Sequence, residues 1–272
     1  MKRTLSQQKG TYMKAIRLIN LATLLSLLLL PGCSHCNRKV DSLYQTSTID
    51  ALLVGIYDGS TTFADLKRNG DFGIGTFDAL DGEMIALGGA FYQAKADGTV
   101  LPVADTAKTP FAVVKFFTPE TTLPLAAAPD LTSLMRQLDA LLPTPNYFYA
   151  LKIEGTFPAI KIRSVPAQQK PYPGLAEAAS RQTVFQFQEI SGTIIGFRTP
   201  GFAKGINLPG YHFHFISADR KVGGHLLDCR IETALLSLDK VSELHLALPE
   251  NSEFSQGNLG QDHGRDLEKA ER

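Results

Sequence analysis

Hydrophobic positions along the chain recur mostly with the period of a β-strand, and only a few segments show the spacing of a helix. The clearest helix is predicted at residues 131–142, where leucines fall on one face before a proline. Two shorter helices are predicted at residues 48–57 and 62–67. The second begins with Thr62 and Asp65 in the arrangement of a capping box. These helices are too few and too short to dominate the fold.

Strand-like runs occupy most of the remaining sequence. They are predicted at residues 83–92, 99–103, 111–117, 184–189, 193–197, 211–217, 226–238 and 244–248. Residues 148–154 and 157–165 alternate around Gly155, which predicts a hairpin there. Because the strands come in blocks rather than alternating strictly with helices, the pattern predicts an α+β fold. We expect two sheet-rich subdomains with mixed or antiparallel sheets and a few short helices.

A glycine-rich segment at residues 70–77 needs a separate interpretation. It contains Gly73 and Gly75 but no third glycine at the dinucleotide-binding spacing and no long helix after it. The pattern therefore excludes that cofactor site, and we expect these glycines to form turns. Further along, a loop at residues 166–173 leads to a short Ala-rich helix.

The N-terminal segment differs from the rest of the chain in charge and hydropathy. Residues 1–32 contain five basic and no acidic residues, and the uncharged apolar run at residues 19–30 is too short for a stable membrane-spanning helix. We interpret residues 1–32 as a signal peptide. The Leu-Pro-Gly-Cys sequence that ends it resembles a bacterial lipobox, which predicts cleavage before Cys33 and lipidation of that residue. Secretion without a lipid is the alternative.

The predicted location and organisation follow from this segment. The protein is expected to be exported, to the periplasm or cell envelope, and to contact a membrane only through a lipid anchor at Cys33. Beyond the signal peptide we expect a linker at residues 33–42, an N-terminal α+β part at 43–180 and a C-terminal β-rich part at 181–272, together forming one catalytic unit. From Cys33 onward there are 22 basic and 27 acidic residues and no basic cluster, so nucleic acid is excluded as an expected partner.

Three of the six histidines lie within 14 residues of one another. On a strand, His212 and His214 project from one face, and the aromatic residues beside them project from the other. A two-residue turn at Asp219-Arg220 would place His225 directly opposite His214, on the same face. Three imidazoles at these separations can bind one zinc ion and leave a fourth coordination position open. The pattern therefore predicts a zinc site.

The histidine pattern alone leaves other interpretations open. The sequence His-x-His also occurs without a metal, and a one-residue slip in register would turn His225 to the opposite face. His35, His245 and His263 have no comparable neighbours and are expected to lie outside the cluster. The zincin motif, the nucleophile elbow and the P-loop are absent from the sequence.

Several motifs together make the chain resemble the bacterial α-acetolactate decarboxylase family. They are Asp-Gly-Glu-Met-Ile at 81–85, Phe-Tyr-Ala-Leu-Lys-Ile-Glu-Gly at 148–155, Gly-Thr-Ile-Ile-Gly-Phe at 192–197, Gly-Tyr-His-Phe-His-Phe at 210–215 and Gly-His at 224–225. The resemblance runs from about Leu43 to Glu271. It implies decarboxylation of 2-acetolactate to acetoin and carbon dioxide, with Zn²⁺ as the cofactor, and it implies a homodimer. The family's zinc ligands match His212, His214 and His225.

The resemblance also implies three catalytic residues. The family's active-site glutamate after Asp-Gly matches Glu83, and its arginine matches Arg163 in the strand after the Ile-x-Gly segment. A further glutamate near the C-terminus matches Glu271, although Glu268 is an alternative because no distinctive motif surrounds either one. We expect Arg163 to orient the substrate carboxylate and the glutamates to manage the proton that completes acetoin.

Two other function classes stay open from the residues alone. An exported, non-enzymatic zinc-binding module would use the same three histidines without requiring Glu83 or Arg163 nearby. A zinc hydrolase would use a glutamate to activate metal-bound water. Product analysis distinguishes them, because only a decarboxylase releases carbon dioxide without consuming water.

Overall fold

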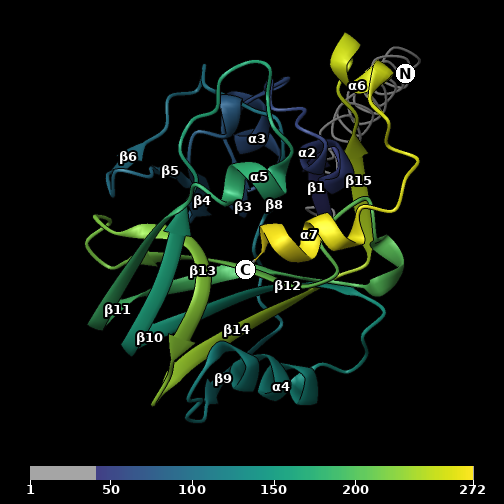
Figure 1. Cartoon of the computed structure of the whole chain (residues 1–272). Coiled ribbons are helices and arrows are strands. Elements are labelled where there is room, and N and C mark those ends of the chain that lie inside the picture. Colours follow the sequence, from purple (N-terminus) through teal and green to yellow (C-terminus); the bar gives the residue numbers. More distant parts are fainter. Residues whose placement is uncertain (1–40, 272) are drawn as a thin grey trace, which may run out of the picture. The chain divides into compact units, whose positions relative to one another are not determined.

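The structure of the protein is a computed structural model that describes residues 41–271. This part of the chain contains two large β-sheets, a two-stranded ladder and several short helices (Figure 1). The predicted signal peptide, the lipobox at Cys33 and most of the predicted linker lie outside the described residues. Between residues 41 and 271, no helix is long and apolar enough to span a lipid bilayer.

The larger sheet has seven strands and joins the start of the described chain to its C-terminal part. In spatial order the strands are β15 (Glu243–Ala247), β1 (Ser42–Thr46), β8 (Ala112–Lys115), β3 (Phe72–Thr76), β4 (Glu83–Leu87), β5 (Ala90–Ala94) and β6 (Val100–Pro102). β1 and β15 run parallel, whereas the other neighbouring pairs are antiparallel. A separate ladder pairs β2 (Thr61–Thr62) with β7 (Lys108–Thr109). The larger sheet is therefore mixed, as predicted.

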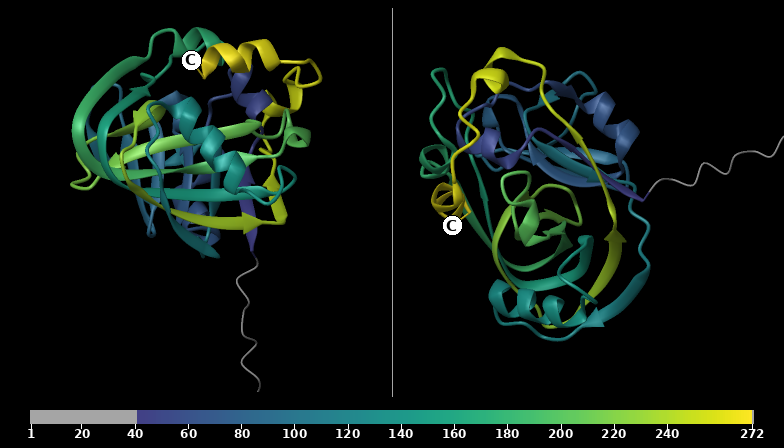
Figure 2. Two further views of the ribbon diagram at one scale, coloured as in Figure 1. Left: turned by 90° about the horizontal axis from the view of Figure 1, so that it is seen from below. Right: turned by 90° about the vertical axis from the view of Figure 1, so that its right-hand side faces the viewer.

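The smaller sheet has six strands, four of which close into a ring. The strands are β9 (Thr121–Leu125), β10 (Phe148–Ser164), β11 (Thr183–Thr199), β12 (Gly210–Ser217), β13 (Gly223–Arg230) and β14 (Ala234–Val241). β10 pairs with β11, β11 with β12, β12 with β13, and β13 with the second half of β10. β14 and β9 extend the sheet from the first half of β10. Figure 2 shows the strong curvature of β10 and β11 that this closure requires.

The helices are short and several begin at polar capping residues. They are α2 (Ile49–Leu53), α3 (Phe63–Asn69), α4 (Leu131–Leu141), α5 (Leu175–Ala179), α6 (Ser252–Gln256) and α7 (Gly264–Ala270), with 3₁₀ turns η2 (Asp78–Leu80) and η3 (Gly201–Ala203). Thr62 and Asp65 form both hydrogen bonds of the predicted capping box at α3. Asp130 caps α4 by accepting from the backbone N–H of Ser133. The predicted α+β class with short helices is confirmed.

The glycine-rich segment forms strand β3, so the prediction of turns there is wrong. β3 lies between β4 and β8 and all of its residues are buried. A Cβ added at Gly73 would lie 2.3 Å from the carbonyl oxygen of Val113, and one at Gly75 would lie 2.5 Å from that of Phe111. Glycine is needed here because the neighbouring strand approaches closely, not because the chain turns.

The hairpin predicted around Gly155 is also wrong. β10 continues through Gly155, which pairs with Gly192 of β11. The runs predicted separately at 184–189 and 193–197 likewise belong to the single strand β11. Alternation on both sides of a glycine does not distinguish a turn from a long curved strand, and here closure of the ring favours the long strand.

Two predicted runs are divided in the structure. The run at 83–92 forms the hairpin β4–β5, whose turn contains Gly88 and Gly89 with positive φ values of 61° and 80°. The run at 226–238 forms parts of β13 and β14. Both runs contain signals for a division that the strand predictions passed over: Gly88-Gly89 in the first and the polar pair Glu232-Thr233 in the second.

The two sheets do not follow the expected division of the chain at residue 180. That boundary falls between β10 and β11, which are neighbours in the ring, and β15 belongs to the other sheet. The sheets contact each other where β3 and β4 meet β11, β12 and β13. One buried cluster there combines Ile74 and Ile85 with Ile195 and Ile216. The candidate functional residues lie at this junction.

Candidate metal centre

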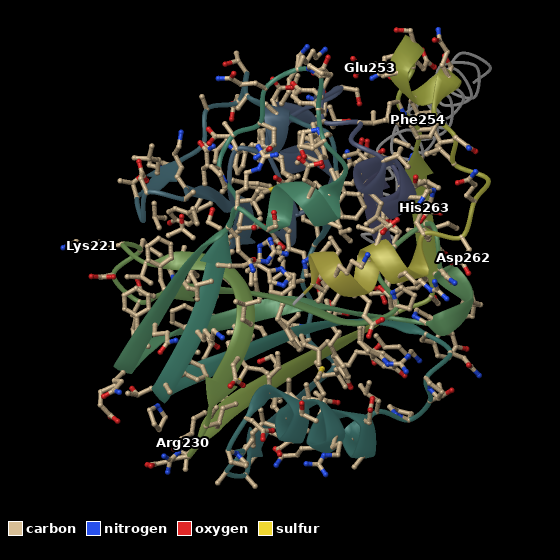
Figure 3. The ribbon with its side chains drawn as sticks, viewed as in Figure 1. Lys221, Arg230, Glu253, Phe254, Asp262 and His263 are labelled. Carbon is tan, nitrogen blue, oxygen red and sulfur yellow. The ribbon has the colours of Figure 1, made fainter. Side chains whose placement is uncertain are left out.

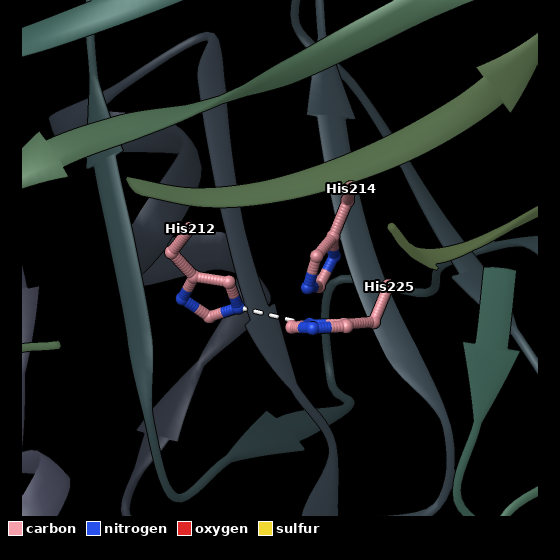
Figure 4. Close-up of side chains that lie close together, drawn as sticks. All are labelled: His212, His214 and His225. Carbon is pink, nitrogen blue, oxygen red and sulfur yellow. Dashed lines mark hydrogen bonds between the residues drawn. The ribbon is translucent and has the colours of Figure 1, made fainter. Parts of the chain in front are cut away.

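One antiparallel pair of strands, β12 and β13, holds the three clustered histidines. His212 and His214 lie on β12 and project from the face opposite to Phe213, which packs in a second hydrophobic cluster. The ladder pairs His214 with His225 of β13. The register predicted from the turn between these strands is therefore confirmed, and all three imidazoles lie on one side of the pair (Figure 4).

The imidazoles are close enough to bind one ion. Their ring centroids are 5.1 Å apart for His212 and His214, 5.0 Å for His212 and His225, and 5.4 Å for His214 and His225. One nitrogen from each residue lies within 4.8 Å of the others. His212 Nε2 and His225 Nδ1 face each other at 3.2 Å, which is the dashed line in Figure 4. The arrangement provides three converging nitrogen ligands.

The hydrogen bond of His214 leaves one ring nitrogen available to a metal. His214 Nδ1 lies 2.9 Å from the carbonyl oxygen of Met84, which can only accept, so Nδ1 donates and Nε2 carries the lone pair. His214 is fully buried, and Nε2 has no hydrogen-bond partner among the described residues. A buried acceptor without a partner is unfavourable, and a metal ion at this position would satisfy it.

The surroundings keep all three imidazoles neutral at neutral pH. Burial, together with the smaller effect of the nearby positive charge of Arg163, lowers the pKa of His212 to about 3. Burial and the same arginine hold the pKa values of His214 and His225 well below their ordinary range. Because a histidine must be neutral to bind a metal, the donor set fits a divalent cation.

Arg163 and Glu83 lie beside the histidines as a buried ion pair. Arg163 is the cross-strand partner of His225, and Glu83 is the first residue of β4. Arg163 Nη1 donates to Glu83 Oε1 at 3.2 Å, and Glu83 Oε2 lies 3.6 Å from His214 Nε2. Burial raises the pKa of Glu83, while the positive charge of Arg163 opposes that shift.

Helix α7 brings a second carboxylate to the same place. Arg163 Nη2 donates to the backbone carbonyl of Ala270 at 3.1 Å and lies 3.9 Å from Glu271 Oε1. Glu271 Oε2 lies 3.4 Å from His225 Nε2. Burial raises the pKa of Glu271 to about 7, with Arg163 opposing the shift. Glu268, the alternative from the sequence, has an exposed side chain.

A small cavity connects these groups. It measures ≈ 40 Å³, more than the ~10–15 Å³ that a cavity needs to hold one water molecule. The three histidines, Arg163 and the two glutamates line its polar side. Six apolar side chains also line the cavity, with Gly75 and Thr76: Ile49, Leu52, Leu80, Phe111, Val165 and Leu175. The cavity wall therefore combines charged and apolar side chains.

Sequence reasoning missed the element that carries Glu271. No prediction placed a helix at α7, whose N-cap residue His263 makes no side-chain capping bond (labelled with Asp262 in Figure 3). α7 lies beside α5, as Figures 1 and 2 show, and Ala270 is fully buried. The backbone carbonyl of Met84 was also missed, because no side-chain pattern reports a main-chain acceptor.

The other histidines and the cysteine of the described residues lie outside the three-histidine group. His245 stacks on Tyr44 with ring centroids 5.3 Å apart, and His263 lies 3.9 Å from Asp266. Both are separate from the three-histidine group. Cys229 is buried and free, and burial raises its pKa to about 12. Cys33 lies outside the described residues.

The comparisons of this sequence with known proteins all indicate the same family. Residues 43–261 match the sequence profile described as "Alpha-acetolactate decarboxylase". A Methanosarcina mazei protein of that name is 50% identical over 236 residues, which covers 87% of this chain and 82% of the relative. The Bacillus subtilis protein of that name is 39% identical over 236 residues, covering 86% and 92% of the two chains.

Solved structures agree with these sequence matches. The crystal structure of alpha-acetolactate decarboxylase from Bacillus subtilis strain 168 has a TM-score of 0.82 to this chain at 39% identity. The match covers 85% of this chain and 99% of that structure. A Staphylococcus aureus protein, described as of unknown function and similar to alpha-acetolactate decarboxylase, matches with a TM-score of 0.79 at 32% identity, covering 84% and 98%. The shared fold therefore extends along nearly the whole length of the two solved structures and over about 85% of this chain.

Proposed function

The chain belongs to the alpha-acetolactate decarboxylase family, and on this basis we propose that it decarboxylates 2-acetolactate to acetoin and carbon dioxide. One observation carries the proposal: three neutral histidines, an arginine and two carboxylates line one small cavity. In the reaction, the bond between C2 and the carboxylate carbon breaks and carbon dioxide leaves. C2 then gains one proton, so no water and no redox partner is consumed.

We propose Zn²⁺ as the cofactor, held by His212, His214 and His225. Neutral nitrogen donors suit zinc, and the partnerless Nε2 of His214 supports a ligand at this position. When bound, zinc supplies a Lewis acid that stabilises the negative charge that develops on a substrate oxygen as carbon dioxide leaves. The hydrogen bond from His214 to Met84 orients that ring before any ion arrives.

Arg163 is the group that binds and orients the substrate carboxylate in this proposal. Its guanidinium is buried, and its Nε has no hydrogen-bond partner among the described residues. Its Nη atoms already bind one carboxylate, that of Glu83, and one carbonyl, that of Ala270. A planar guanidinium can bind a carboxylate through two parallel hydrogen bonds, which fixes the direction in which carbon dioxide departs.

Glu83 and Glu271 are the groups that hold and deliver the proton. Both lie within 4 Å of Arg163 and of a histidine ring nitrogen. Burial raises the pKa of each carboxyl, and it raises that of Glu271 to about 7, so Glu271 can hold a proton near neutral pH. The two glutamates come from different elements, β4 and the end of α7, and both contact the same guanidinium.

Two further parts of the proposal rest on the sequence alone. The protein is exported and anchored by a lipid on Cys33, a proposal supported by the basic and apolar N-terminal pattern and the lipobox-like sequence. It forms a homodimer, a proposal supported by the family resemblance. Membrane fractionation of the wild type and of Cys33→Ser tests the first, and light scattering tests the second.

Product analysis of the full-length protein tests the proposed activity. Incubation with racemic 2-acetolactate is expected to release equal amounts of carbon dioxide and acetoin. Zinc bound without release of carbon dioxide would contradict the proposal and favour a binding module. Consumption of water with formation of acetate would instead identify a hydrolase.

A further inference from the structure

We propose that Leu80 is a specificity-determining residue whose side chain limits the size of the alkyl groups on the 2-hydroxy-3-oxo acid substrate. The inference rests on the proposed function, because it takes the substrate's polar groups to bind the histidines and Arg163 that line the cavity. Leu80 lies in the η2 turn between β3 and β4, three residues before Glu83. Four observations support its role: backbone conformation, anchoring, side-chain direction and space.

The backbone of this turn is unusual. Ala79 and Leu80 have φ values of 57° and 59°, in the left-handed region that residues with a Cβ rarely adopt. Two consecutive non-glycine residues in this region are unfavourable unless the surrounding structure fixes them, and such sites concentrate where function requires a particular geometry. The conformation therefore needs an explanation beyond simple chain reversal, for which glycine or asparagine would suffice.

Hydrogen bonds on both sides of the turn hold this conformation in place. The N–H of Ala79 donates to the carbonyl of Tyr57 at 2.9 Å, and the N–H of Gln168 donates to the carbonyl of Ala79 at 2.8 Å. The N–H of Gly82 donates to the carbonyl of Val165 at 3.0 Å, just beyond the end of β10. The turn is thus fixed to the segment that directly follows β10, the strand that carries Arg163.

The side chain of Leu80 lines the cavity, whereas that of its strained neighbour does not. Leu80 is 4% exposed and is one of the apolar residues that line the cavity. Ala79 is half-buried and is not part of the cavity wall. The left-handed backbone therefore places one bulky apolar side chain in the cavity and fixes it relative to Glu83.

The space available makes each apolar side chain important for substrate size. The proposed substrate has three oxygen-bearing groups and two methyl groups. If the oxygens bind the histidines and Arg163, the methyl groups face the apolar side chains of the wall. The free volume of the whole cavity is ≈ 40 Å³, so the side-chain carbons of Leu80 occupy space that a longer alkyl group would need. Ile49 and Leu175 also line the cavity, but they lie on separate short helices rather than in the connection that positions Glu83.

The test compares substrates that differ by one methylene group. kcat/KM is measured for 2-acetolactate and for its two homologues, one with ethyl in place of methyl at C2 and one with propionyl in place of acetyl. In Leu80→Ala, the ratio of homologue to 2-acetolactate is expected to rise by about 10-fold or more for at least one homologue, since one methylene in an apolar site changes kcat/KM by about 10–200-fold. The homologue that responds identifies the methyl group that faces Leu80.

Two variants keep the test interpretable. Leu80→Gly also removes the side chain, and glycine suits the left-handed backbone. This variant is therefore expected to fold even if Leu80→Ala is too unstable to assay. Ala79→Gly relaxes the same turn without enlarging the cavity, and its ratio is expected to match the wild type.

Unchanged ratios for both homologues in a folded Leu80 variant would overturn the inference. An equal shift in Ala79→Gly would also overturn it, because the turn rather than the side chain would then be responsible. If the wild type itself releases no carbon dioxide from 2-acetolactate, the proposed function fails, and that result is distinct from unchanged ratios in an active enzyme.

Discussion

The metal-binding and proton-handling parts of the site are built in different ways. His214 and His225 are cross-strand partners, and the hydrogen bonds of an antiparallel ladder fix their register. Glu271 follows α7, a seven-residue helix with no side-chain N-cap, whose position depends on the buried Ala270 and on its bond to Arg163. The histidines are therefore positioned by local pairing, and Glu271 is positioned by contacts between distant parts of the chain.

Arg163 connects these two parts. It is the cross-strand partner of His225 in the ring, and its guanidinium contacts both Glu83 and the end of α7. The comparison therefore predicts that changes in the strand pair abolish metal binding. Changes in α7 should leave the metal in place and reduce turnover.

Removal of a histidine ligand is expected to have the largest effect. His225→Ala should lose bound zinc and lower kcat by at least about 10²–10³-fold, because charge stabilisation on the substrate oxygen is lost with the ion. Zinc content by mass spectrometry and carbon dioxide release measure both effects. His245→Ala, which removes an imidazole that stacks on Tyr44, is the matched control and should retain zinc. Full zinc content in His225→Ala would contradict the assignment.

Glu271→Gln is expected to separate the two parts of the site. Zinc content should stay within about twofold of the wild type, while kcat falls by about 10²-fold or more, since the amide cannot hold or deliver the proton. Glu268→Gln provides the control on the same helix, and its exposed side chain should be replaceable without loss of turnover. A normal kcat in Glu271→Gln, or a large loss in Glu268→Gln, would reverse the assignment of the two glutamates.

Arg163→Lys is expected to weaken the connection between the ring and α7. A lysine cannot make the two separate contacts that the guanidinium makes with Glu83 and Ala270. We expect kcat/KM to fall by about 10–100-fold and amide hydrogen exchange at residues 264–271 to become faster, with zinc retained. Unchanged exchange in this segment would show that Arg163 does not hold the helix.

Asp130→Ala is expected to have the smallest effect of these substitutions. It should lower thermal stability slightly and leave zinc content and turnover unchanged. It removes the N-cap of α4, which should lower Tm by about 2–4 °C or less at pH 7. Hydrogen bonds from Ser133 hold the pKa of Asp130 below its usual value, so the carboxylate stabilises the folded chain above the unfolded pKa. This contribution disappears as the pH falls through the folded pKa. The Tm difference should therefore shrink below about pH 4, and a constant difference would contradict this cause.

Local signals predicted the features that depend on neighbouring residues. The capping box at Thr62 and the pairing of His214 with His225 depend on spacing within a few residues or across one turn, and the structure confirms both predictions. The cap at Asp130 is equally local but was not predicted. The position of Glu271 depends on packing across the chain. Glu268 lies three residues earlier and therefore near it on the helix surface, so spacing alone did not distinguish the two.

Glycines caused the largest errors in the predicted fold. Gly73 permits close approach of β8, and Gly155 lies inside a continuous strand opposite Gly192, yet both resemble turn glycines in a single sequence. The reason is physical: a missing Cβ serves both tight turns and close contact between strands. Which use applies depends on a partner strand that is distant in the sequence.

Zinc titration of the chelated full-length protein tests the central claim most directly. Zinc is removed and then returned in increments, while carbon dioxide and acetoin release from 2-acetolactate are measured at each step. The account predicts that activity rises linearly until one zinc is bound per chain and then stays constant, and that His212→Ala recovers none of it. Full activity in the zinc-free protein, or saturation with zinc without acetoin, would contradict the account.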